Sequence, residues 1–195
     1  MILPSFFIII GSSLDTVGAV VYLKDMIKGR AQPNKATWLL WSFSASISFV
    51  SSVAEGLGIV SVLAFVAVIN SLIVLIPSFF LEKGYWKLEP VDYFMGLFSL
   101  LAIILWVATN DPFLALVFSI IADAFAYVPT YRKSWSNPES ESLTSFCFGA
   151  LAGLVVLLSL PVYSLEVILF PAYILIGESG VVITLLVRSR SKDVK

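Results

Sequence analysis

The basic residues of this chain all fall in connections on one side of a predicted membrane. The long apolar stretches divide into seven spans, at residues 2–23, 37–54, 58–81, 91–109, 112–130, 143–160 and 163–187. With this division, all twelve Lys and Arg residues lie in the first, third or fifth connection or in the C-terminal tail. Short loops rich in Lys and Arg remain in the cytoplasm. The pattern therefore predicts seven transmembrane helices, with the N-terminus outside and the C-terminus cytoplasmic.

The composition agrees with a membrane protein. The chain has 195 residues, of which 59% are hydrophobic, whereas a soluble domain is about 45–50% apolar. Seven spans of about 20 residues need about 140 residues, which leaves short loops and no room for a soluble domain. We expect an all-α, multi-pass protein of the plasma membrane, in contact with anionic lipid headgroups at its basic loops. Trp38, Trp41, Trp86 and Trp135 near the cytoplasmic ends, with Trp106 and Tyr163 at the outer ends, suggest an interfacial aromatic belt.

Several kinds of chemistry are excluded by residue types that are rare or missing. The chain has no His and a single cysteine, Cys147, so it has no intrachain disulfide and no metal or haem site built on imidazole. No Ser–His pair, phosphate loop or metal cluster is present, so we expect neither an enzyme nor a cofactor. The basic segments lack interleaved aromatic residues, and we expect no nucleic acid partner.

Three acidic residues lie well inside the predicted spans: Asp15, Asp123 and Glu178. The other ten lie in loops, in tails or at span ends. An ionised, unpaired carboxylate in mid-membrane costs roughly 2.5–3.5 kcal/mol on insertion scales. No Lys or Arg lies within a span to neutralise it. These carboxyls should therefore carry a proton, face a water-filled cavity, or form hydrogen bonds with hydroxyls and amides. Intramembrane acids of this kind indicate a functional site, although they can also tie helices together through hydrogen bonds worth about 0.6 kcal/mol.

A faint internal repeat relates the two halves of the chain. Asp15 and Asp123 are 108 residues apart, and so are Asn70 and Glu178. A rival register matches Tyr22 with Tyr127 and would break the Asp match. Each copy has an odd number of helices, so one additional crossing between them restores a common orientation. We therefore predict a first three-helix repeat at 1–82, a linker helix at 83–110 and a second three-helix repeat at 111–195, related by an axis along the membrane normal.

These features resemble the SWEET and PQ-loop superfamily of membrane transporters over essentially the whole length of the chain. The resemblance rests on the seven spans, the N-out topology, the linker helix and the segment 127–134, Tyr-Val-Pro-Thr-Tyr-Arg-Lys-Ser, followed by Pro138. The Pro-Gln dipeptide of that family is missing, and Pro129-Thr130 stands in its place. The resemblance implies a substrate-facing Asn in the third helix of each copy. Asn70 fits that place, but the second copy has Glu178.

We expect a transporter of a small polar solute, such as a sugar, polyol or amino acid, that works by alternating access. Proton coupling through Glu178 and Asp123 is a further hypothesis, and a homo-oligomer is compatible with the sequence. The alternative is a seven-helix membrane protein that transports nothing, such as a receptor or an assembly factor. The candidate substrate-binding residues are Asn70, Glu178, Asp123, Asp15, Tyr127, Trp41, Ser44 and Phe148.

Different observations support these candidates. Asp123 and Tyr127 stand four residues apart and share one helix face. Trp41 and Phe148 could stack on a sugar-like ring, although such aromatics are more often belt or core residues. Ser44 belongs to a series of serines at helical spacing, and close helix packing is the alternative explanation for it.

Overall fold

The computed structural model describes the backbone of residues 2–81, 84–85 and 89–193, and the side chains of residues 5–81, 84–85 and 89–189. Within these ranges the chain folds into seven α-helices and two short 3-10 turns. The helices are α1 (Ile2–Ile27), α2 (Lys35–Ala54), α3 (Ser61–Phe80), α4 (Pro90–Thr109), α5 (Pro112–Ser136), α6 (Leu143–Leu158) and α7 (Leu165–Asp193), and the turns are η1 (Gly58–Val60) and η2 (Pro138–Ser140). The predicted all-helical class is confirmed.

Six of the seven helices, all except α6, are long and apolar enough to cross a membrane. The chain is thus an integral membrane protein by the length and composition of its helices. α6 has 16 residues, which gives about 24 Å against the ~30 Å of a hydrocarbon core. The predicted span at 143–160 therefore extends two residues past the C-terminal end of the helix. The helix ends at Leu158, because Pro161 follows closely and the residue before a proline avoids the α-helical conformation.

Local sequence signals determine where several helices begin. The side-chain oxygens of Asn34, Asp111 and Ser142 accept hydrogen bonds from the first-turn amides of α2, α5 and α6. These contacts satisfy amides that have no partner inside the helix. Pro90 and Pro112 occupy the first turns of α4 and α5, where a missing N–H costs nothing. The alternation of apolar runs and capping residues thus produces helices of nearly the predicted bounds.

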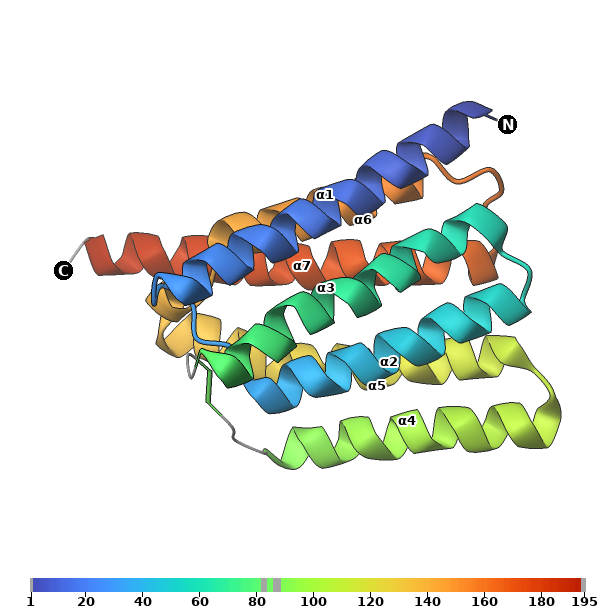
Figure 1. The fold of residues 1–195 in the computed structure, drawn as a ribbon, viewed down its shortest axis with the longest axis horizontal. Helices are drawn as coiled ribbons and strands as arrows, with labels where there is room; N and C mark the ends of the chain where they lie inside the picture. Colours follow the sequence, from blue (N-terminus) through green and yellow to red (C-terminus); the bar gives the residue numbers. More distant parts are fainter. Residues whose placement is uncertain (1, 82–83, 86–88, 194–195) are drawn as a thin grey trace.

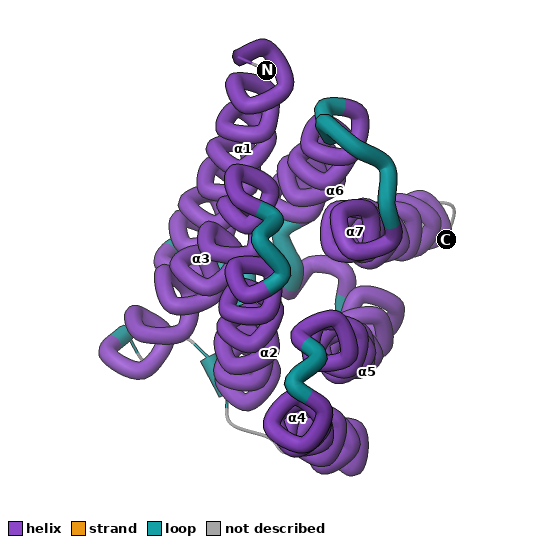
Figure 2. The backbone as a smooth tube through the Cα atoms, turned by 90° about the vertical axis from the view of Figure 1, so that its right-hand side faces the viewer, coloured by secondary structure: helices purple, strands orange, loops and turns teal. Residues whose placement is uncertain are grey.

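Six helices form a closed ring, and the seventh lies outside it. In order around the ring, α1 packs on α3, α3 on α2, α2 on α5, α5 on α7, α7 on α6, and α6 on α1. α4 packs against α5 and α2 from the outside, as Figure 2 shows. The N- and C-terminal ends of the chain lie at opposite ends of the bundle (Figure 1). The centre of the ring is therefore lined by helices from both halves of the chain.

The basic connections meet at the end of the bundle where α7 ends. Lys133, near the end of α5, forms an ion pair with Glu141 at 2.8 Å and donates to the carbonyl of Gln32 in the α1–α2 connection. Arg188 donates to the carbonyl of Trp135 at 2.9 Å. This end of the bundle is therefore held together by contacts between connections that are far apart in sequence. Lys83, Trp86, Lys87 and Lys195 lie outside the described residues.

The helices turn apolar side chains outward and small hydroxyl groups inward. On α4, Leu97, Leu100 and Ile104 are each about half exposed. Inside the bundle, the hydroxyls of Ser48 and Ser119 lie 2.8 Å apart between α2 and α5. In lipid, small residues allow close helix approach, and their hydroxyls can link neighbouring helices. The outer surface suits a hydrocarbon solvent.

Candidate functional site

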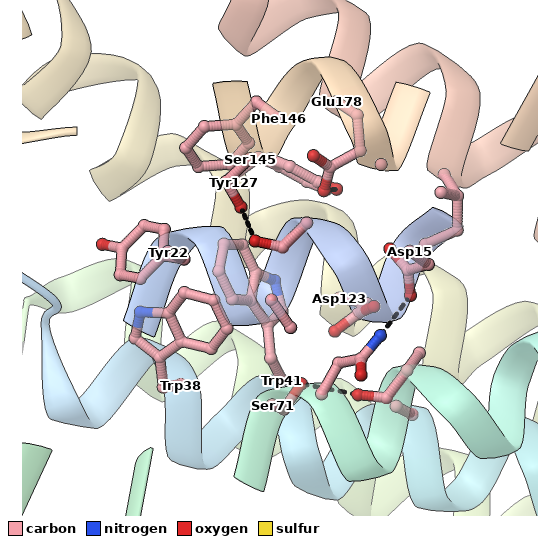
Figure 3. A pocket seen from close by; sticks show the side chains of 17 residues that line it. Asp15, Tyr22, Trp38, Trp41, Ser71, Asp123, Tyr127, Ser145, Phe146 and Glu178 are labelled. Carbon is pink, nitrogen blue, oxygen red and sulfur yellow. Dashed lines mark hydrogen bonds between the residues drawn. The ribbon is translucent and has the colours of Figure 1, made fainter. Parts of the chain in front are cut away.

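The centre of the six-helix ring encloses a cavity of about 80 Å³. This volume holds several water molecules, since about 10–15 Å³ of such space holds one. Every helix of the ring contributes to its wall, and α4 does not. The lining residues are Asp15, Gly18, Ala19, Tyr22, Trp38, Trp41, Ala45, Ala67, Asn70, Ser71, Asp123, Tyr127, Ser145, Phe146, Gly149, Ile174 and Glu178, and Figure 3 shows them from close by.

One half of the cavity is built by α1 and α3. Asn70 donates from Nδ2 to Oδ2 of Asp15 at 2.8 Å, so the amide and the carboxyl act as a pair. Asn70 is only 6% exposed, and its Oδ1 has no hydrogen-bond partner within the described part of the chain. A buried, unsatisfied carbonyl oxygen is costly and therefore needs an explanation in a native structure.

The other half of the cavity is built by α5 and α7. Tyr127 donates its hydroxyl to Oε1 of Glu178 at 2.8 Å. Asp123, one turn before Tyr127, is 6% exposed, and its Oδ1 also has no hydrogen-bond partner in the described ranges. Tyr173 of α7 lies beside this carboxyl. Acidic groups from both halves of the chain therefore face one enclosed space, with Asp15, Asp123 and Glu178 all in its wall (Figure 3).

Gly149 and Gly177 allow the Glu178 carboxyl and the Tyr127 ring to lie close to the backbones of α6 and α7. A Cβ at Gly149 of α6 would lie 2.6 Å from Oε2 of Glu178, and a Cβ at Gly177 of α7 would lie 2.5 Å from the ring of Tyr127. Any larger residue would have to push the carboxyl or the phenol aside. The position of the Tyr127–Glu178 pair thus depends on the absence of a side chain on both α6 and α7.

Aromatic rings form a continuous layer in the cavity wall. Tyr22 and Trp38 have ring centroids 4.9 Å apart, Trp38 and Trp41 are 5.0 Å apart, and Trp41 and Tyr127 are 5.3 Å apart. Phe146 packs edge-on against Tyr22 at 6.3 Å. The prediction that Trp38 and Trp41 belong to an interfacial aromatic belt is therefore wrong, because both side chains point toward the centre of the six-helix ring rather than toward its lipid-facing surface.

Beyond this layer lies a charged network at the basic end of the bundle. Tyr22 donates to Oε2 of Glu141 at 2.9 Å, and Oε1 of Glu141 pairs with Lys133. The side chains of Lys133 and Glu141 are only 13% and 5% exposed. Tyr85, at the same end, has its pKa raised by partial burial and by the nearby negative charge of Glu141. The aromatic layer and this ion pair together separate the cavity from the basic end.

The structure brings six of the eight candidate residues together around the cavity: Asp15, Trp41, Asn70, Asp123, Tyr127 and Glu178. It does not bring Ser44 or Phe148 there. The hydroxyl of Ser44 lies 3.4 Å from that of Ser99 in α4, between helices. Phe148 lies against Gly18 of α1, and the phenylalanine of α6 that lines the cavity is Phe146.

The sequence interpretation did not identify Tyr22, Trp38, Ser71, Ser145, Phe146 or Gly149 as cavity residues. A signal existed for Tyr22, because the rival repeat register pairs it with Tyr127. Phe146 and Phe148 are two residues apart and therefore point to nearly opposite faces of the helix, about 200° apart. Only one of these two faces can line the cavity, and the sequence interpretation selected the wrong one.

The described part of the chain contains no group of three His, Cys, Asp or Glu side chains close enough to hold a metal ion. The three carboxyls of the cavity thus face a common space without converging on one point. No protein-family model matches the chain, and neither does any curated protein or solved structure.

Proposed function

We propose that this protein transports a small polar solute across the membrane by alternating access. The observation that supports this most strongly is the central cavity, to which six helices from both halves of the chain contribute carboxyl, amide and aromatic groups. Ionisable groups inside a membrane protein mark substrate or ion pathways. Hydrogen bonds that only tie helices together do not require a cavity of about 80 Å³ between the helices.

The packing of the helices supports two like-oriented repeats. α3 packs between α1 and α2, and α7 packs between α5 and α6. The two sets meet where α1 packs on α6 and where α2 packs on α5. If α1, α2 and α3 are exchanged with α5, α6 and α7, the same pairs of helices remain in contact. Asp15 and Asn70 occupy the first and third helices of one set, and Asp123 and Glu178 occupy those of the other. We therefore propose repeats at 1–82 and 111–195 joined by a linker at 83–110, the arrangement that the SWEET resemblance implies; the boundary at 82–83 lies outside the described residues.

The basic end of the bundle is proposed to face the cytoplasm, with the N-terminus outside. α6 serves as the seventh crossing in this arrangement, although it has only 16 residues. It packs between α1 and α7, and irregular backbone at membrane depth is tolerated where it is covered by protein or lines a water-filled space.

Alternating access requires that each end of the cavity open in turn. In this structure the basic end is closed by the aromatic layer and by the Lys133–Glu141 ion pair. Pro77, Pro129 and Pro171 lie inside α3, α5 and α7. Each removes one hydrogen bond from its helix and makes bending easier at that point. We propose that the two sets rock apart at the basic end once the ion pair separates.

Proton coupling is proposed to act through Glu178, with Asp123 as its neighbour. Glu178 faces Asp15 from α1 and Tyr127 and Asp123 from α5, and none of these groups brings a positive charge. A carboxyl in such surroundings can exchange a proton with each side of the membrane as access alternates. Movement of the solute would then depend on the proton gradient.

The test is uptake into proteoliposomes with and without a pH gradient, using a panel of labelled sugars, polyols, amino acids and amines. We expect Glu178→Gln to remove the dependence on the gradient. Glu166→Gln is the matched control, because it makes the same change on α7 at a residue outside the cavity wall. Unchanged flux and unchanged pH dependence in Glu178→Gln would refute proton coupling. Absence of uptake for every solute would favour the alternative of a protein that transports nothing.

A further inference from the structure

We infer that the solute bound in the central cavity is a small organic cation that carries a primary ammonium group. The binding part of this inference depends only on the cavity, and the flux part rests on the proposed transport function.

The first argument is the charge of the wall. Asp15, Asp123 and Glu178 line the cavity, and none of the described Lys or Arg side chains does. Each carboxyl in such a place must be neutralised by a proton or by a cation. An ammonium group supplies a positive charge without requiring that all three carboxyls be protonated. A neutral sugar or polyol requires that protons neutralise all three carboxyls, and an anionic solute adds to any negative charge that remains.

The second argument is the balance of hydrogen-bond donors and acceptors. Five lining donors already have an acceptor within the protein: Asn70 donates to Asp15, Tyr127 to Glu178, Tyr22 to Glu141, Ser71 to the carbonyl of Ala67, and Ser145 to the carbonyl of Gly18.

One lining acceptor is unused and a second is poorly satisfied. Oδ1 of Asn70 has no hydrogen-bond partner among the residues that the structure describes, and Oδ1 of Asp123 makes no well-aligned hydrogen bond there, although the hydroxyl of Tyr173 lies beside this carboxyl; the side chains of Asn70 and Asp123 are 94% buried. An ammonium group has three N–H donors and no acceptor. A hydroxyl has only one donor and also brings acceptors, for which the indole N–H groups of Trp38 and Trp41 are the other lining donors. The cavity therefore suits a ligand that donates.

The third argument is the aromatic layer. Trp38, Trp41 and Tyr127 present rings to the cavity, and the face of an aromatic ring attracts a cation within about 6 Å. Such an attraction is strongest where water is excluded. A wall that combines carboxyls with tryptophan faces favours the ammonium end of a ligand and also accommodates its short carbon chain.

A bare metal ion fits this wall less well. Among the described residues, no three carboxylate-type ligands converge on one point, whereas Mg²⁺ and Ca²⁺ need six or more oxygen ligands at 2.0–2.6 Å. An organic cation a few atoms long can instead place its ammonium group near one carboxyl and its chain along the rings.

The binding test compares three probes of equal length by calorimetry on the purified full chain in detergent. They are butane-1,4-diol, 4-aminobutan-1-ol and butane-1,4-diamine, which carry zero, one and two positive charges near neutral pH. We expect 4-aminobutan-1-ol to bind at least about tenfold more tightly than the diol, because hydrogen bonds to charged groups are stronger than neutral ones. Equal affinity for the two, or tighter binding of the diol, overturns the inference. This comparison needs no variant, so it does not depend on a mutant that folds.

Asp123→Asn then tests whether the cavity is the site. It keeps the size of the side chain and removes its charge, and we expect an affinity for 4-aminobutan-1-ol about tenfold lower with the diol little changed. Glu166→Gln, outside the cavity, should bind all three probes as the unmodified chain does. If Asp123→Asn binds the amine normally while its thermal unfolding is unaltered, the amine binds elsewhere and the inference fails.

Uptake into proteoliposomes separates this inference from the proposed function. Binding of the amine without any uptake would refute transport and leave the ligand class intact. Uptake of a neutral polyol, with no preference for the amine, would support transport and refute the ligand class. Saturable uptake of the amine in preference to the diol supports both.

Discussion

Replacing Gly149 by alanine should disable the site without changing its charge. The new Cβ would lie 2.6 Å from Oε2 of Glu178, whereas ordinary contact begins at 3.4 Å, so the carboxyl must move by about 0.8 Å. The hydrogen bond from Tyr127 to Glu178 is 2.8 Å long. If the carboxyl moves away from Tyr127, that distance reaches about 3.6 Å, beyond the range of an O–H···O bond.

The size of the effect follows from the hydrogen bond that the ligand ammonium would make with a correctly placed Glu178 carboxylate. Such a bond to a charged group contributes about 1.5–3 kcal/mol, and every 1.4 kcal/mol is tenfold in affinity. We therefore expect Gly149→Ala to weaken binding of 4-aminobutan-1-ol by about 10–150-fold, as measured by calorimetry in detergent. Gly96→Ala on α4 is the control, because its Cβ would meet nothing within 4 Å.

The reasoning also requires that the two residues act together. In a Glu178→Gln background the alanine should have a much smaller effect, since the carboxyl that it displaces is already gone. An affinity unchanged by Gly149→Ala would refute the argument. So would an equal loss in the presence and in the absence of the Glu178 carboxyl.

Other predictions concern the basic end, the helix packing and the orientation. Lys133→Met leaves Glu141 buried without its cation, which costs about 3–5 kcal/mol, so thermal unfolding in detergent should occur at a lower temperature. Adding Glu141→Gln should recover part of this loss of stability. Purely additive effects of the two substitutions would argue against coupling between the two side chains. Gly153→Ala places a Cβ 2.7 Å from the backbone nitrogen of Leu175, so α6 and α7 must separate at a cost of about 1–3 kcal/mol, and an unfolding temperature equal to that of Gly96→Ala would contradict this close contact. Protease sites added at the two ends of the chain should be cut from opposite sides of the membrane, and cutting of both from one side would rule out an odd number of crossings.

The helices were predictable because polar and basic residues stand out against an apolar background. The same contrast identified Asp15, Asn70, Asp123 and Glu178, since no other carboxyl or amide side chain lies well inside the predicted spans. Spacing then indicated that two of them came from each half of the chain. The structure places all four in one cavity wall.

Aromatic residues gave no such contrast. In a helix made of large apolar residues, the sequence does not indicate which face turns inward, because both lipid and protein interior accept a Phe or a Trp. Phe148 was therefore chosen where Phe146 lines the cavity, and Trp38 was assigned to the interfacial belt.

The ion pair between Lys133 and Glu141 could not be foreseen either. Both residues lie in a predicted cytoplasmic loop, where charges are ordinarily solvated. The structure extends α5 to Ser136, six residues past the predicted end of its span, and this extension carries Lys133 into the bundle end beside Glu141.

Cysteine accessibility tests most directly whether the two helix sets enclose a wet passage. In a Cys147→Ser background, single cysteines at Ala67 of α3 and at Ser145 of α6 would stand in the cavity wall, and one at Ile104 of α4 would face lipid. A thiol reacts as the thiolate, which forms readily only in contact with water. We predict that a small cationic methanethiosulfonate reagent modifies the cysteines at 67 and 145 at least about tenfold faster than the one at 104. If the two cavity positions react no faster than the lipid-facing position, the space between the helix sets is dry and the account is wrong.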